Sequence, residues 1–222
     1  MGYELEFADI FKNLDLLVRG ARYTVLLWAI SFGFGLAAGL ALGIARASRV
    51  KWVNWPVTAY IELFRNTPVL VQLVWFYYAF PVLTGLQMSA LVAASLGLCL
   101  NTSAYCAEIY RGGIESIVKG QWEAGRALGM GHLTLLRRII LPQAIRRMIP
   151  AFTNRAIELA KMTAIASVIA VHELMYEARL LSATIYRPLE VFTVIALVYF
   201  AVIYPGTLIA YRIEARLKKQ GT

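Results

Sequence analysis

Charged residues are scarce in this sequence, and their scarcity excludes an ordinary water-soluble domain. Only 16% of the 222 residues are Asp, Glu, Lys or Arg, whereas 59% are hydrophobic. Soluble domains usually contain about 45–50% apolar and about 25% charged residues. Uncharged runs cover residues 23–45, 66–107 and 191–211, and a helix needs roughly 20 apolar residues to cross a bilayer. Composition therefore predicts an integral membrane protein.

Residues suited to metal or redox chemistry are equally rare, with two cysteines and two histidines in the chain. Cys99 and Cys106 fall on one predicted helix with about 10 Å of rise between them, too far for a disulfide. No HExxH, CxxC or GxxxxGK[ST] motif occurs, so we predict no catalytic residue, no metal site and no cofactor in this chain. Residues 1–20 lack a basic segment followed by a short apolar core, so we expect no cleaved signal peptide.

The apolar runs divide into five predicted transmembrane helices, over residues 20–46, 52–82, 88–110, 148–171 and 190–211. The segment "FPVLTGLQ" at residues 80–87 contains the Pro, Gly and polar residues that separate the second helix from the third. Gly35, Gly39 and Gly43 give the first helix a small-xxx-small spacing, which allows close helix approach. We expect one all-α integral membrane domain, residues 1–222, with its largest polar segment between the third and fourth helices.

Basic residues indicate how the chain is oriented, because loops rich in Lys and Arg stay in the cytoplasm. They concentrate at residues 46–51, 111–148 and 212–219. Fewer fall on the opposite side, namely Lys12, Arg19, Arg22, Arg179 and Arg187. We therefore expect the N-terminus outside and the C-terminus in the cytoplasm. The net charge of +9 follows from this orientation, and we expect no nucleic-acid partner.

The polar segment at residues 119–144 contains "EAGRALGMGHLTLLRRIILPQA". We expect a short helix over residues 121–128, ended by Gly129, which can adopt the left-handed backbone of a helix cap. A second helix is expected from His132, with Pro142 disrupting its continuation. Periodicity alone also fits an amphipathic helix on anionic lipid. The small residues Ala124 and Gly125 instead favour close docking against a protein.

The residues of this segment resemble the EAA loop of ATP-binding-cassette (ABC) importer permeases. The similarity runs from Glu123-Ala124-Gly125 through Gly129 to Ile139 and Leu141-Pro142. Residues 20–46, 60–81, 104–121 and 141–169 are similar to the polar amino acid permease branch of that family. The chain departs from the family at Gly125, where a second Ala is usual, and at Met162-Thr163-Ala164, where this branch commonly has Asp-Thr-Ser.

The resemblance implies a permease subunit of the bacterial inner membrane that imports polar amino acids. In the family the EAA loop docks on a pair of ABC ATPase subunits, which bind ATP and Mg. It also implies a second permease subunit, identical or homologous, and an extracytoplasmic solute-binding protein, besides the membrane lipid around it. The residues carried over to ATPase coupling are Glu123, Ala124, Gly125, Arg126, Gly129, Leu141 and Pro142.

The fourth predicted helix carries Arg155, Glu158 and Lys161. A charge at the bilayer centre costs about 2.5–3.5 kcal/mol, so these side chains are not expected to face lipid together. One reading is a self-neutralised stripe packed between helices. The other, favoured by the resemblance, is the wall of a substrate path. Its residues would be Asn154, Arg155, Glu158, Lys161, Thr163 and Ser167, with Asn101 and Ser103 from the third helix.

Arg155 bears on the substrate class. A guanidinium pairs well with a carboxylate, so the sequence slightly favours an acidic amino acid such as glutamate or aspartate. An ion-coupled secondary amino acid transporter would also carry charges inside the membrane. Such transporters usually contain internal repeats, and we find no convincing repeat in this sequence.

Overall fold

The structure is a computed structural model that describes residues 5–48 and 50–219, and all regular secondary structure in these residues is helical. The first three elements are the helices α1 (Ala8–Lys12), α2 (Leu14–Arg46) and α3 (Lys51–Asn66). The next elements are α4 (Val69–Val74), the π-helical turn η1 (Trp75–Ala79), α5 (Phe80–Thr84) and α6 (Ala90–Glu115). Then come α7 (Lys119–Ala127), α8 (His132–Leu135), the π-helical turn η2 (Leu136–Ile140) and α9 (Leu141–Met162). The 3-10 helix η3 (Thr163–Ile169), α10 (Leu174–Ile185) and α11 (Pro188–Lys219) complete the fold.

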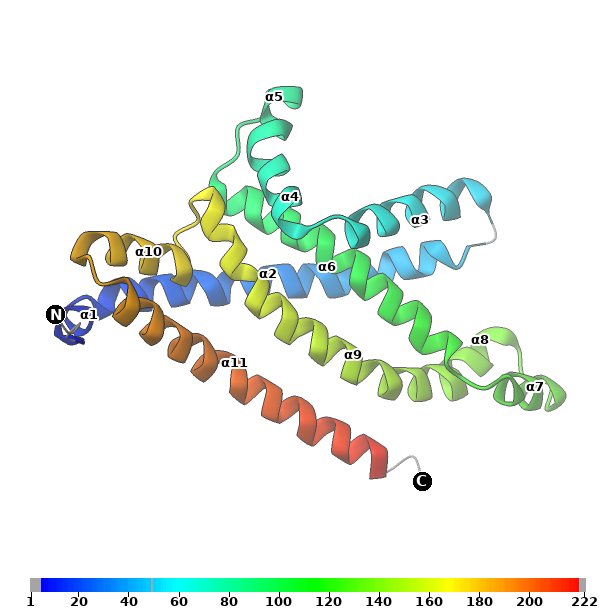
Figure 1. Ribbon diagram of the computed structural model, residues 1–222. Helices are drawn as coiled ribbons and strands as arrows, with labels where there is room; N and C mark the ends of the chain where they lie inside the picture. Colours follow the sequence, from blue (N-terminus) through cyan, green and yellow to red (C-terminus); the bar gives the residue numbers. More distant parts are fainter. Residues whose placement is uncertain (1–4, 49, 220–222) are drawn as a thin grey trace.

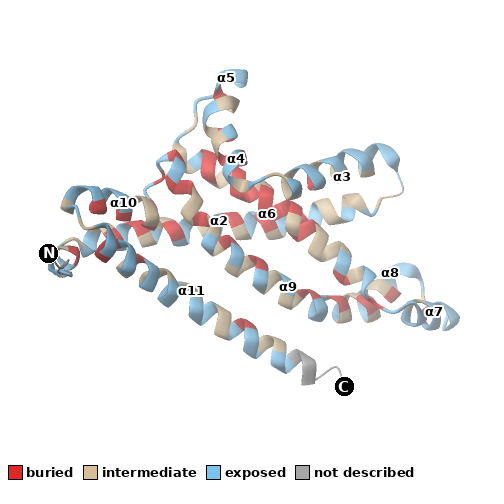
Figure 2. Ribbon diagram, viewed as in Figure 1, coloured by how far each residue is buried: buried red, intermediate tan, exposed pale blue. Residues whose placement is uncertain are grey.

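The long helices α2, α6, α9 and α11 run between two ends of the molecule (Figure 1). One end carries α1 and α10, and the other carries α7 and α8. Buried residues gather where α2, α6 and α9 meet, whereas most of α11 and much of α3 is exposed (Figure 2). The core there includes Leu27, Leu73, Leu98 and Leu159, each fully buried.

Among the described residues, three helices are long and apolar enough to cross a membrane: Leu14–Arg46, Ala90–Glu115 and Pro188–Arg216. They correspond to the first, third and fifth predicted spans. A bent pair of helices over residues 51–84 passes the same criterion when taken together. The fourth predicted span corresponds to α9 and η3, which do not meet the criterion within the described chain.

The second predicted span, residues 52–82, is not one continuous helix, because the chain bends by 108° between Asn66 and Val69. Thr67 and Pro68 both have extended backbone, with ψ of 141° and 134°. A residue before proline is pushed out of the helical region, so Thr67-Pro68 ends α3. The predicted break at residues 80–87 is confirmed, since α5 ends at Thr84 and Gly85 follows with φ of 73°.

The expectation that Pro142 ends a helix is also wrong. Helical structure continues from α8 through η2 into α9, and Pro142 is the second residue of α9. Proline is tolerated where the regular hydrogen-bond ladder is already interrupted. The widened turn η2 directly before α9 supplies that interruption.

Glycines let α2 and α6 approach closely, as their spacing predicts. A Cβ atom at Gly35 would lie 2.4 Å from Thr102 Cγ2, and one at Gly39 would lie 2.4 Å from Cys106 Cβ. The one at Gly39 would also lie 2.9 Å from the Ser103 carbonyl oxygen. Because the Ser103 carbonyl belongs to the backbone, it cannot move aside without a shift of α6, so α6 holds a fixed position against α2.

This contact predicts opposite effects for two alanine substitutions in α2. Gly39→Ala forces α2 and α6 apart and lowers the stability of the protein by about 1–3 kcal/mol. Gly33→Ala is the matched control, because a Cβ there meets nothing within 4 Å; removing a helical glycine then stabilises by about 0.5–1 kcal/mol. Thermal unfolding in detergent measures both, and equal shifts would contradict the close packing.

Candidate functional site

Arg155 of α9 is buried, with 3% of its surface exposed. Its Nη2 donates to Asn101 Oδ1 at 2.7 Å and to Thr102 Oγ1 at 3.1 Å. Its Nη1 donates to Glu158 Oε2 at 2.9 Å. The guanidinium also lies 4.2 Å from the centre of the Tyr105 ring, a cation–π distance. Arg155 is thus held against α6 and does not face lipid.

Asn101 extends this contact to the bend between α3 and α4. Its Nδ2 donates to the Phe64 carbonyl oxygen at 2.8 Å and to Gln72 Oε1 at 3.2 Å. Gln72 Nε2 donates in turn to the carbonyl oxygens of Phe64 at 2.9 Å and Thr67 at 3.1 Å. These carbonyls come from the last turn of α3, where a helix leaves its acceptors unpaired. The side-chain amides of Asn101 and Gln72, both buried, therefore supply hydrogen-bond donors to the carbonyl groups at the end of α3.

The substrate-path candidates on α9 separate into an exposed and a buried set. Asn154, Glu158 and Lys161 are exposed and lie at the i, i+4, i+7 spacing of one helix face. Glu158 pairs with Arg155, and none of the described carboxylates pairs with Lys161. The three charges therefore leave this part of α9 with one net positive charge, carried by Lys161.

Buried candidates have partners of their own. Thr163 Oγ1 donates to the Ala160 carbonyl oxygen at 2.8 Å. Ser103 Oγ lies 2.7 Å from the Tyr60 hydroxyl and donates to the Leu100 carbonyl oxygen at 2.8 Å. Ser167 is 6% exposed. Only Asn101 of the predicted α6 residues is joined to Arg155.

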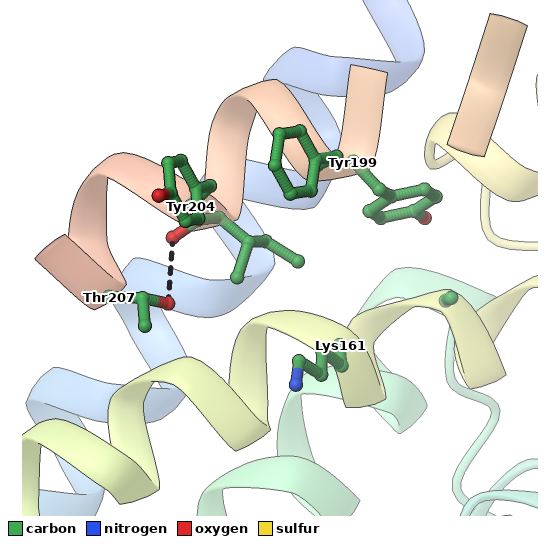
Figure 3. Close-up of a pocket in the computed structure, with 7 residues that line it drawn as sticks. Lys161, Tyr199, Tyr204 and Thr207 are labelled. Carbon is green, nitrogen blue, oxygen red and sulfur yellow. Dashed lines mark hydrogen bonds between the residues drawn. The ribbon is translucent and has the colours of Figure 1, made fainter. Parts of the chain in front are cut away.

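A cavity of about 430 Å³ lies between the end of α9 and α11. Lys161 stands on the α9 wall, and Tyr199, Tyr204 and Thr207 stand on the α11 wall (Figure 3). A second cavity of about 270 Å³ shares Tyr199 with it and reaches Thr24 and Trp28 of α2. Ligand sites usually measure about 300–1,000 Å³ and combine apolar walls with few polar groups. The first cavity has that size and character.

The predicted helix at residues 121–128 is confirmed as α7, and Gly129 ends it. Gly129 has φ of 71°, its N–H donates to the Arg126 carbonyl oxygen at 2.9 Å, and Met130 N–H donates to the Gly125 carbonyl oxygen at 3.1 Å. This pair of bonds is a Schellman motif. The chain therefore reverses at Gly129, and the ring of Trp122 stacks on His132 with centroids 5.8 Å apart.

The coupling residues of α7 divide between its two faces. Gly125 is buried against Leu135 of α8, and a Cβ there would lie 2.3 Å from Leu135 Cδ1. Glu123, Ala124 and Arg126 are exposed. Pro142 is exposed and Leu141 half-buried at the start of α9. The departure from the family at Gly125 thus coincides with close packing against Leu135.

Two polar clusters were missed from the sequence. Glu108 of α6 accepts from Arg46 of α2 and from Arg111 Nη2 at 2.8 Å, and lies 3.6 Å from Arg65 of α3. Long-range pairing of this kind leaves no signal in local spacing. Together these contacts tie the same end of α2, α3 and α6.

Glu173 forms the second cluster, at the other end. Its carboxylate caps α10 by accepting from Tyr176 N–H at 2.8 Å and Met175 N–H at 3.0 Å. The Tyr199 hydroxyl of α11 donates to it at 2.9 Å. Burial raises the pKa of the Glu173 carboxyl. Glu is not one of the usual N-cap residues and Tyr199 lies on another helix, so the sequence predicted neither.

Comparison with known protein families matches residues 35–219 to the binding-protein-dependent transport system inner membrane component. The chain is 37% identical over 191 residues to the probable amino-acid ABC transporter permease protein YckA of Bacillus subtilis, covering 86% of this chain and 84% of that protein. It is 34% identical over 216 residues to the glutamine transport system permease protein GlnP of Escherichia coli, covering 97% and 99%.

Among solved structures, the chain is similar to the crystal structure of an amino acid ABC transporter with histidines. The TM-score is 0.92 at 34% identity, over 96% of this chain and 100% of that chain. The overall fold is therefore nearly the same as that of a chain in such a transporter.

The packing of Gly125 predicts a local effect. Gly125→Val places side-chain atoms against Leu135, separates α7 from α8 and costs about 1–3 kcal/mol locally. We expect faster trypsin cleavage after Arg126, which lies in this segment. Ala124→Val is the control, because Ala124 is exposed; if both variants are cleaved at the same rate, Gly125 is not required for the packing.

Proposed function

We propose, from the premise that this chain belongs to the family of binding-protein-dependent transport system inner membrane components, that it forms the substrate path of an ABC importer for polar amino acids. The chain is a permease subunit of a multi-pass inner-membrane system and is not itself an enzyme. Because the chain belongs to this family, we discard the alternative hypothesis of an ion-coupled secondary transporter. One observation carries the substrate proposal: Lys161, the last residue of the exposed polar face of α9, lines a ligand-sized cavity.

The assembly that we propose follows from the family. A pair of ATPase subunits binds ATP and Mg and receives α7 through the exposed residues Glu123, Ala124 and Arg126. A second permease, identical or homologous, completes the path, and an extracytoplasmic solute-binding protein delivers the amino acid. The N-terminus of the permease chain lies outside and its C-terminus lies in the cytoplasm. In this orientation α7 and the basic residues within 126–147 face the ATPase.

The fifth crossing is part of the same proposal. Helix α9 with η3 crosses the membrane although it carries charges, because Arg155 and Glu158 are paired and Lys161 faces the cavity. A water-filled path accommodates polar side chains that lipid does not. The path is lined by Asn154, Glu158 and Lys161. Arg155, Thr163, Ser167, Asn101 and Ser103 stand behind this face and hold its shape.

The finer substrate assignment rests on charge. An amino acid brings a carboxylate and an ammonium group, and an acidic side chain adds a second carboxylate. Glu158 balances Arg155, so the unpaired Lys161 is the cation offered to that second carboxylate. We therefore propose that glutamate or aspartate is preferred over neutral and basic amino acids.

A charge reversal on α7 tests ATPase coupling. Glu123→Lys leaves the fold unchanged, because Glu123 is exposed, but abolishes amino acid uptake and the co-purification of the ATPase subunits. Thr184→Lys, exposed on α10 at the other end of the molecule, is the control and keeps both. Normal uptake by Glu123→Lys would refute α7 as the docking element.

Removing the cavity cation tests the substrate class. In proteoliposomes that contain the whole importer, Lys161→Gln lowers glutamate uptake relative to glutamine uptake about tenfold, the loss of one charge-assisted contact of about 1.4 kcal/mol. Arg179→Gln removes the same charge from an exposed position on α10 and leaves the ratio unchanged. A wild-type importer that takes up arginine in preference to glutamate would rule out the acidic substrate.

A further inference from the structure

We propose that Arg155 is a positioning residue: it fixes the orientation of the Asn101 amide, and through it joins α9 to the bend between α3 and α4. Movement of the coupling segment thereby reaches the amide that holds the bend through the contact between Arg155 and Asn101. This inference rests on the proposed function, since it assumes that α7 and α8 move when the ATPase closes. Arg155 acts on the path through Asn101 and need not touch the amino acid.

Arg155 fixes the orientation of the Asn101 side-chain amide. A side-chain amide offers one oxygen acceptor and two N–H donors, and it can flip by 180° unless its partners differ. Arg155 has only donors, so the 2.7 Å contact with Nη2 defines the Asn101 atom there as the oxygen. The two N–H donors then face Phe64 and Gln72, as their acceptor atoms require.

The carbonyl groups at the bend between α3 and α4 need hydrogen-bond donors. Breaking a helix inside a membrane leaves carbonyls unpaired, and each such group costs several kcal/mol in an apolar surrounding. The Phe64 carbonyl oxygen accepts from both Asn101 and Gln72. With the Asn101 amide flipped, two oxygens would face each other at Phe64. The Phe64 carbonyl at the 108° bend therefore keeps its Asn101 donor only in the amide orientation that Arg155 imposes.

Arg155 is also connected to the coupling segment. Helical structure runs without a gap from His132 through α8, η2 and α9 to Ile169. Leu135 packs against Gly125 of α7 at one end of this run, and Arg155 lies further along it. A shift of α7 therefore displaces the continuous helical run that carries Arg155. The buried guanidinium transmits the shift because it bonds to α6 and α9 together.

Hydrogen exchange in the assembled importer tests this inference. The importer, in lipid nanodiscs, is measured without nucleotide and with ATP trapped by vanadate, following residues 119–135 and residues 64–72. We expect a nucleotide-dependent change in both segments of the wild type. Asn101→Asp keeps a partner for Arg155 but loses both donors, and Arg155→Met removes the donor to the Asn101 oxygen. Both variants should lose the change at residues 64–72 and keep it at residues 119–135.

Thr102→Val is the matched control. It removes the neighbouring bond from Arg155 at 3.1 Å with little change in volume and leaves Asn101 in place, so both changes should persist. If Asn101→Asp does not assemble with the ATPase, Arg155→Met decides the test, and Arg155→Lys should restore part of the change. A retained change at residues 64–72 in the variants, or its loss in Thr102→Val, overturns the inference. An unchanged segment 119–135 in the wild type overturns the proposed coupling itself.

Discussion

The contact between Asn101 and Arg155 is the interaction on which the rest of the structure depends. A membrane helix that bends by 108° exposes carbonyl groups to an environment that offers them no water. Asn101 satisfies one of these carbonyls and Arg155 sets the orientation in which it does so. Without that contact the Asn101 amide loses the partner that fixes its orientation toward the Phe64 carbonyl, and the guanidinium keeps only Thr102 and Tyr105 as partners on α6.

Close packing of α2 on α6 makes this contact possible. Gly35 lies beside Thr102 and Gly39 lies beside Cys106, so α6 is fixed in register against α2. Asn101 therefore points to one side, toward the bend and α9. Glu108 fixes one end of the α2–α3–α6 unit and Glu173 fixes α10 to α11 at the other. The cavity beside Lys161 lies where α9 and α11 are not tied together in this way.

Local signals in the sequence predicted the elements that local chemistry decides. Gly129 ended α7, the glycine spacing of α2 gave the close helix contact, and the apolar runs gave α2, α6 and α11. Thr67-Pro68 carried the signal for the bend, but the apolar run around it suggested an uninterrupted helix. Pro142 misled in the opposite sense, because a preceding π-helical turn absorbs it. Periodicity placed Arg155, Glu158 and Lys161 on one broad face, whereas the structure turns Arg155 inward. Its partners Asn101 and Tyr105 lie on another helix, and no local pattern reveals such pairs.

We infer that the contact between Arg155 and Asn101 carries movement from the coupling segment to a bent membrane helix. Cryo-electron microscopy of the assembled importer, without nucleotide and with trapped ATP, measures it most directly. We expect the bend at Thr67-Pro68 to depart from 108° in one state while Arg155 Nη2 stays within hydrogen-bond distance of Asn101 Oδ1 in both. A bend that is the same in both states, or one that changes after Arg155 and Asn101 have separated, would contradict it.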